Sequence, residues 1–200
     1  MDRQSSNLLE TVDHLQKIDQ LTGRFLVTMA AELRTLDDGF DLMRLEAGWF
    51  DLDIQEVDLK QLVERVMSTI SDYMAINYGA AEGKQDKIVK PQLESTIPDI
   101  LPIVKLDRWR IERILTEALL EAVQISRNRE GRVTFLVECN KGWLNIEVSD
   151  DGVGLPEHLI NRTPALSSTS QVVVELHGGN LEIKNQAGGG WVINLNLPIR

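Results

Sequence analysis

The sequence Asp150-Asp-Gly-Val-Gly-Leu-Pro156 carries the most structural information in this chain, because it places two glycines beside a carboxylate directly after a strand-like run. In residues 144–150, apolar side chains alternate with polar ones. This period of two is typical of a half-buried strand, and such a strand would deliver Asp150 to its end. Gly152 and Gly154 permit backbone angles and close approaches that a side chain would prevent.

A strand end of this kind has the features of a purine site. Its carboxylate can accept a hydrogen bond from an exocyclic amine such as that of adenine, while the glycines leave room for the ring. Asp150, Gly152 and Gly154 are therefore candidate nucleotide-binding residues. The alternative is a tight structural turn, left over from such a site, in which the same residues hold no ligand.

Three more segments accompany this one in a fixed order. Residues 107–126 sit where sensor histidine kinases have the metal-binding helix of their ATP-binding domain, and residues 150–156 resemble the first glycine box of that domain. Residues 175–183 are similar to the junction after its second glycine box, and residues 188–198 to its closing strand. The resemblance implies a GHKL-type α/β sandwich, in which helices cover one face of a mixed sheet, as in gyrase and certain heat-shock chaperones.

The N-terminal part resembles the histidine box of the kinase dimerisation domain, which normally reads Ser-His-Glu-Leu-Arg-Thr-Pro. Residues 25–36 contain the matching segment, with Ala31 in the place of the phospho-accepting histidine. Alanine supplies no nucleophile, so autophosphorylation at the family's site is excluded. Whether Ala31 is natural or engineered stays open. By resemblance, Glu32, Arg34 and Asp38 are candidate contacts for a response-regulator receiver.

Apolar residues recur at gaps of three or four between Ile18 and Ala47, which predicts a helix. One continuous helix over residues 6–47 would run about 60 Å, farther than the following domain could cover. Its apolar face then needs a second chain, so we expect a homodimer; whether the region is a hairpin or one long helix stays open. We place a helical dimerisation region at residues 1–48 and a kinase-like ATPase domain, lacking a full lid, at residues 49–200.

Capping signals and apolar periods predict the other elements. The first half has a connector over 48–56, a helix capped by Asp58 with a core stripe from Leu59 to Ile70, and strands over 87–94 and 103–106. A helix over 107–126, capped by Asp107, follows, and then a hairpin of 132–139 and 143–149 around Asn140-Lys-Gly142. The chain ends with a helix over 167–177, terminated by Gly178 and Gly179, and two final strands.

The helix over 107–126 has two acidic residues where the kinases have a pair of asparagines, the second of which binds Mg²⁺. The i, i+4 spacing puts Glu117 and Glu121 on one helix face, where they would repel each other and a triphosphate unless a cation intervened. A carboxylate can bind Mg²⁺. By resemblance, Glu117 is a nucleotide contact and Glu121 a metal ligand; the alternative is a solvated helix face.

The phosphate cradle of the family is reduced in this chain. Nucleotide-binding members carry a flexible lid and then a glycine-rich turn at a helix N-terminus, whose free N–H groups hold phosphates. Residues 157–170 contain no glycine and are too short for a lid. We therefore expect no cofactor, with ATP and Mg²⁺ bound only if the site is retained.

Composition excludes several classes of partner. A net charge of -10 argues against nucleic acid, which is bound by clustered Lys and Arg. No apolar run approaches the roughly 18 to 20 residues of a membrane span. The single cysteine, Cys139, excludes an internal disulfide and favours a reducing, cytoplasmic setting.

These observations predict a degenerate histidine-kinase homologue, a pseudokinase of two-component signalling that acts through dimerisation and protein interaction. Its partners would be a second copy, an intact kinase or a receiver. One alternative is an active kinase or ATPase that uses Glu117 and Glu121. The other is an ATP-independent phosphotransfer protein that uses His14, whose ring Asp13 could orient. His177 is expected to end a helix, where its charge would favour the helix dipole.

Overall fold

The computed structural model describes residues 39–78, 90–126, 131–155 and 168–199. The chain divides into two compact units, residues 1–50 and 51–200, and each is treated separately. In the first unit, residues 39–46 are helical. The rest of the expected stem lies outside the described residues.

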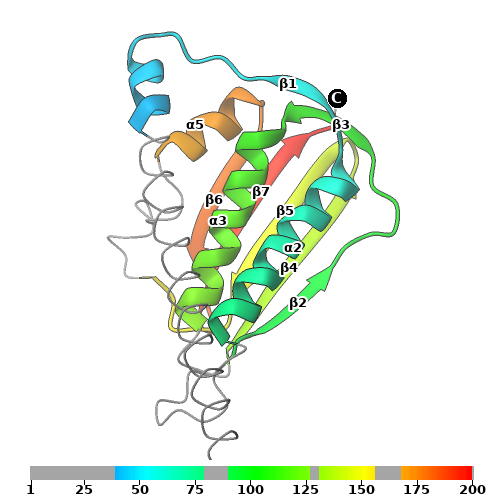
Figure 1. Cartoon of the computed structure of the whole chain (residues 1–200), viewed down its shortest axis with the longest axis vertical. Helices are drawn as coiled ribbons and strands as arrows, with labels where there is room; N and C mark the ends of the chain where they lie inside the picture. Colours follow the sequence, from blue (N-terminus) through cyan, green and yellow to red (C-terminus); the bar gives the residue numbers. More distant parts are fainter. Residues whose placement is uncertain (1–38, 79–89, 127–130, 156–167, 200) are drawn as a thin grey trace, which may run out of the picture. The chain divides into compact units, whose positions relative to one another are not determined.

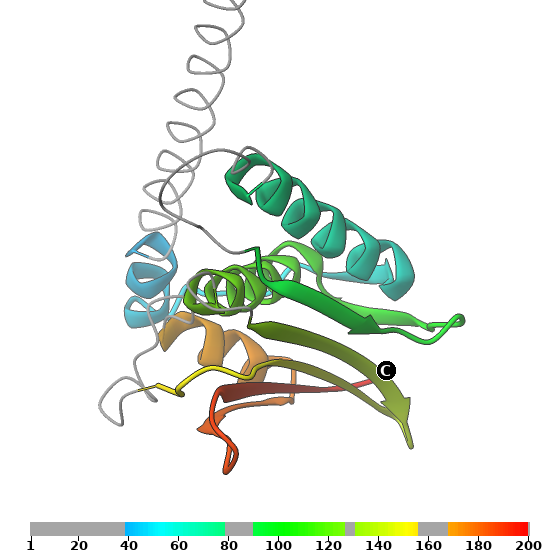
Figure 2. The same cartoon turned by 90° about the horizontal axis from the view of Figure 1, so that it is seen from below.

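The second unit is built on a five-stranded mixed sheet with the order β2-β4-β5-β7-β6. β2 pairs with β4 in parallel, and the other neighbours are antiparallel. Helices α2, α3 and α5 all lie on one face of this sheet (Figures 1 and 2), so the expected α/β sandwich is confirmed. The bounds are Gln92–Thr96 for β2, Arg132–Asn140 for β4, Trp143–Asp150 for β5, Asn180–Asn185 for β6, Trp191–Pro198 for β7, Leu59–Tyr78 for α2, Arg108–Ser126 for α3 and Ser168–Leu176 for α5.

Two further strands form a separate antiparallel ribbon, in which β1 (Ile54–Asp58) pairs with β3 (Ile103–Asp107). The connector expected over residues 48–56 is therefore wrong at its end. The ladder partner of β1 lies about fifty residues away in the chain, beyond the reach of a local pattern. The strand expected over residues 87–94 is also displaced, since β2 begins at Gln92.

Both predicted helix caps are confirmed. Asp58 Oδ1 accepts hydrogen bonds from the backbone N–H groups of Lys60 at 3.0 Å and Gln61 at 3.2 Å. Asp107 Oδ1 accepts one from Arg110 N at 3.1 Å. These bonds satisfy N–H groups that have no partner within the helix. The predicted core stripe of α2 is buried at Leu59, Leu62, Val63, Val66 and Ile70.

The predicted turns are confirmed as well. Lys141 and Gly142 connect β4 to β5 with positive φ angles of 51° and 84°, as a two-residue hairpin turn requires. At the end of α5, Gly178 has a φ of 79° and donates to Glu175 O, and Gly179 N donates to Val174 O at 3.0 Å. This is the glycine cap expected there.

The core lies between the sheet and the helices. Residues paired across β5 and β7 share one face of the sheet, and these pairs are buried. They are Leu144 with Leu197, Ile146 with Leu195, and Val148 with Ile193. The same register brings Asp150, at the end of β5, opposite Trp191, at the start of β7, on the side that faces the helices.

Two expectations from composition concern the described part of the chain. None of its helices combines the length and the apolar character that a bilayer span requires. Cys139 is half-buried on β4 and forms no disulfide. Burial raises the pKa of its thiol, which lowers the thiolate fraction at neutral pH and with it the reactivity of this cysteine.

Candidate functional site

Asp150 closes a turn at the end of β5. Its side chain is 4% exposed. Oδ1 accepts hydrogen bonds from the backbone N–H of Gly152 at 2.9 Å and from that of Trp191 at 3.2 Å. One carboxylate oxygen thus ties the glycine segment to the start of β7. This arrangement has the geometry of the structural turn that the sequence left as an alternative.

Glycines around Asp150 permit close contact between two backbone segments. At Gly190, which has a φ of 79°, an added Cβ would lie 2.0 Å from Asp150 O and 2.6 Å from its Oδ1. At Gly154, with a φ of 81°, a Cβ would lie 2.8 Å from Asn185 Oδ1. The space that these glycines leave is therefore taken by neighbouring parts of the chain itself.

Two amide side chains hold this arrangement together. Asn185 Oδ1 accepts from Leu155 N at 2.7 Å, and its Nδ2 donates to Leu155 O at 2.8 Å. Gln186 Nε2 donates to Asp150 O at 3.3 Å and to Trp191 O at 3.2 Å. Sequence reasoning missed both residues, because the segments they join lie about thirty residues apart. The one available signal was a pair of amides just before three glycines.

Glu117 and Glu121 do not form the solvated face that was one alternative. Glu117 is 9% exposed, and Arg113, one turn earlier, donates from Nε to its Oε1 at 3.0 Å. The guanidinium of Arg113 also stacks over the ring of Trp109, 5.5 Å from its centroid. The sequence predicts that Glu117 and Glu121 would repel each other unless a cation intervened. At Glu117 that cation is the guanidinium of Arg113. Glu121 is half-buried.

His177 follows α5, as predicted, but its role differs from a charge at the helix end. Its Nε2 accepts a hydrogen bond from Asp107 N at 2.9 Å, so this nitrogen carries no proton in that bond. Nδ1 must then be the protonated nitrogen, and it donates to Val173 O at 2.7 Å. A neutral, buried imidazole therefore joins the end of α5 to the end of β3.

Replacing His177 with alanine is expected to lower the free energy of unfolding by about 1–3 kcal/mol, because it leaves the buried N–H of Asp107 without its acceptor. Urea denaturation followed by circular dichroism measures the change. The control is Gln124→Ala on the exposed face of α3, which should leave stability within about 0.5 kcal/mol. A His177→Ala protein as stable as the control would contradict the linking role of this ring.

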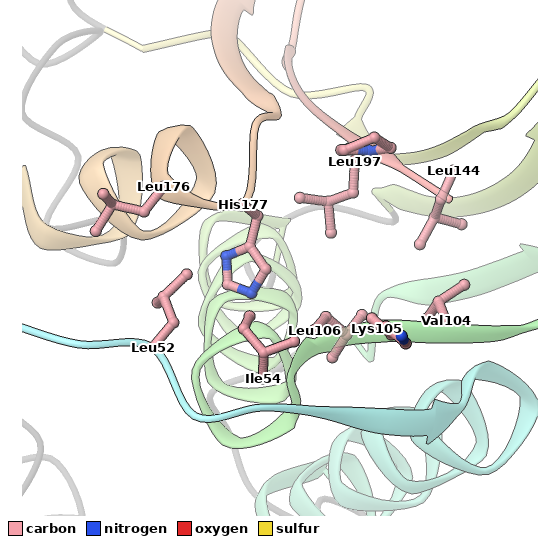
Figure 3. Close-up of a pocket in the computed structure, with 10 residues that line it drawn as sticks. Leu52, Ile54, Val104, Lys105, Leu106, Leu144, Leu176, His177 and Leu197 are labelled. Carbon is pink, nitrogen blue, oxygen red and sulfur yellow. The ribbon is translucent and has the colours of Figure 1, made fainter. Parts of the chain in front are cut away.

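A pocket of about 260 Å³ lies away from Asp150 and Glu117. Its walls come from the β1–β3 ribbon, the end of α5 and the sheet ends opposite to Asp150, and Figure 3 shows His177 reaching into it from α5. None of the predicted site residues lines it. The lining residues are Leu52, Ile54, Val104, Lys105, Leu106, Leu144, Leu176, His177, Leu197 and Pro198.

The remaining predicted residues belong to the N-terminal region. Ala31, Glu32, Arg34, Asp38 and His14 all lie outside the described residues. Within the part of the chain that is described, no three His, Cys, Asp or Glu side chains gather in a group that could hold a metal ion.

The second half of the chain matches a known family model. Residues 106–200 match the model described as histidine kinase-, DNA gyrase B-, and HSP90-like ATPase. Among curated proteins, the circadian input-output histidine kinase CikA of Synechococcus elongatus is 23% identical over 184 residues, which is 83% of this chain and 23% of that protein. The chain thus spans about a quarter of the length of this relative.

Solved structures share the fold. Full-length ShkA in complex with AMPPNP superposes with a TM-score of 0.64 at 19% identity, over all of this chain and 39% of that one. Histidine kinase ThkA in complex with the response regulator protein TrrA gives a TM-score of 0.60 at 16% identity, over 97% of this chain and 61% of that one. At these identities the likeness concerns the fold alone.

Proposed function

We propose that this chain, whose residues 106–200 form a domain of the sensor histidine kinase type within the histidine kinase-, DNA gyrase B- and HSP90-like ATPase family, is a degenerate member that signals through protein interaction and dimerisation. It does not phosphorylate itself at the usual position, because Ala31 offers no nucleophile. Its kinase-like domain acts as a surface that partners recognise.

The burial of Asp150 carries this proposal. A carboxylate that selects adenine must meet the base in an open pocket. Here Asp150 is 4% exposed and holds two backbone N–H groups of its own chain. Breaking that turn to admit a base would leave buried N–H groups unsatisfied, at about 1–3 kcal/mol each.

The acidic helix face supports the same conclusion. Glu117 is paired with Arg113, and both side chains are largely buried. To serve a magnesium triphosphate, Glu117 would have to release this arginine, and separating a buried ion pair is strongly unfavourable. As arranged, these residues do not fit ATP with Mg²⁺. Glu121 could still ligate a cation, yet the metal would lie beside a helix without the family's amide pair.

The partners we propose follow from the kinase-like organisation. One is a second copy of this chain, paired through the helical region at residues 1–48. Another is a response-regulator receiver or an intact kinase, with Glu32, Arg34 and Asp38 as contact residues. ThkA was solved in complex with a response regulator protein, which supports this class of partner for a chain of the same fold.

Titration calorimetry with Mg-ATP tests the proposal. We expect no binding tighter than roughly millimolar, since the residues that would hold the base and the phosphates are engaged or missing. Micromolar affinity would overturn the proposal. ATP hydrolysis that disappears in Glu117→Ala would instead establish the active-ATPase alternative.

A second experiment restores the phospho-accepting histidine that the chain lacks at position 31. Ala31→His supplies the nucleophile, so incorporation of labelled phosphate from ATP would then report only on the second unit. We expect none, and labelled protein would show that nucleotide turnover persists. Acceptance of phosphate from a phosphorylated receiver by the wild type, lost in His14→Ala, would favour the phosphotransfer alternative.

A further inference from the structure

Trp191 stands in an unusual place for the largest aromatic side chain. It opens β7, and extending the register of β5 with β7 by one residue beyond its last pair, Ser149 with Val192, puts it opposite Asp150. On its other side it pairs with Asn185 of β6. Side chains at paired positions point to the same face of a sheet. The indole, the carboxylate and the amide therefore form one row on the face that the helices cover.

The indole is entirely enclosed there. Trp191 is 0% exposed and is among the largest fully buried side chains. Its backbone N–H binds Asp150 Oδ1 at 3.2 Å, which fixes the start of β7 beside the carboxylate. Within the described residues, however, its buried Nε1–H has no acceptor. Buried tryptophans usually find a partner for this group, so packing alone gives no reason to prefer indole over a wholly apolar ring.

Indole and purine share one ring skeleton, a five-membered ring fused to a six-membered ring. We infer that the Trp191 side chain occupies the place of a purine base beside Asp150, as a built-in substitute for the ligand. The inference rests on the proposed function and extends it, because it names what fills the site. Removal of the indole should leave a cavity that accepts adenine.

Trp191→Ala is the direct test, with adenine and indole as the probes. Large apolar cavities left by truncation can bind aromatic molecules of matching size. We expect the truncated protein to melt at a lower temperature than the wild type. Millimolar adenine or indole should raise its melting temperature by about 3 °C, as binding to the native state requires, and should leave the wild type unchanged.

Phe135→Ala is the matched control. Phe135 is also fully buried, on β4, but it pairs with Val148 and not with Asp150. Its cavity should give no response to adenine. An equal adenine response in both variants would show nonspecific filling of any hole, and no response to either probe in Trp191→Ala would overturn the inference.

A milder variant covers the case in which Trp191→Ala does not fold. Trp191→Leu keeps an apolar side chain and opens only part of the space, so adenine should stabilise it less than the fully truncated protein but more than the wild type. Absence of any adenine effect there would count against the inference. Failure of the proposed function looks different, since it would appear as binding of Mg-ATP by the wild type.

Discussion

Asp107→Ala is expected to lower the free energy of unfolding by about 3–5 kcal/mol, because it breaks a largely buried ion pair. Asp107 is 1% exposed. Its Oδ2 accepts hydrogen bonds from the guanidinium of Arg110 and, at 3.0 Å, from Asp53 N, while Oδ1 caps α3. Truncation removes the cap and leaves the largely buried side chain of Arg110 without this carboxylate.

Asp58→Ala is the control for this experiment, because Asp58 caps α2 in the same manner but at an exposed position. Loss of a cap alone costs about 1 kcal/mol. Equilibrium unfolding in urea, monitored by circular dichroism, should separate the two variants clearly. If both lose the same stability, the ion pair and the bond to Asp53 contribute nothing beyond capping.

Gly190→Ala should destabilise the second unit by about 2–5 kcal/mol. A positive φ of 79° costs an alanine about 1–2 kcal/mol, and overpacking adds about 1–3 kcal/mol. The new Cβ would lie 2.0 Å from Asp150 O, so the backbone itself must move. The turn around Asp150 should open, with Trp191 losing part of its enclosure.

Gly188→Ala, two residues earlier in the same turn, serves as its control. An added Cβ there meets no heavy atom within 4 Å, and we expect a change within about 0.5 kcal/mol. Melting curves and tryptophan fluorescence of the two variants give the comparison. A Gly190→Ala protein as stable as Gly188→Ala would mean that the contact between the two glycine segments is not required.

Elements with local signals were predictable from the sequence. Asp58 and Asp107 predicted the starts of two helices, and Asn140-Lys-Gly142 predicted the central hairpin. Caps and tight turns depend on residues only a few positions apart, so a local pattern is sufficient. The strand over residues 103–106 was predicted, but β1 and its pairing with β3 were missed for the opposite reason. The two strands pair although about fifty residues of chain separate them, and neither segment contains a local signal that identifies its partner.

The candidate site was only partly predictable. The sequence located Asp150 and its glycines, and it left the choice between a purine pocket and a closed turn open. That choice depends on residues of another hairpin: Gln186 and Trp191 bond Asp150, and Asn185 bonds the backbone of Leu155. The sequence also predicted repulsion between Glu117 and Glu121, but Arg113 was not recognised as the counterion of Glu117. Arg113 and Glu117 lie one helical turn apart on the same face of α3.

The position of α2 determines where an independently folding fragment can begin. The family match starts at residue 106, but α2 lies before it and packs its buried stripe against α3. A protein expressed from residue 106 onward would lack α2, so the apolar surface of α3 that α2 covers would be exposed to water. We expect such a protein to aggregate. Asp53 would be lost too, and with it a bond to Asp107. Expression boundaries should therefore fall near Asp51, ahead of the ribbon.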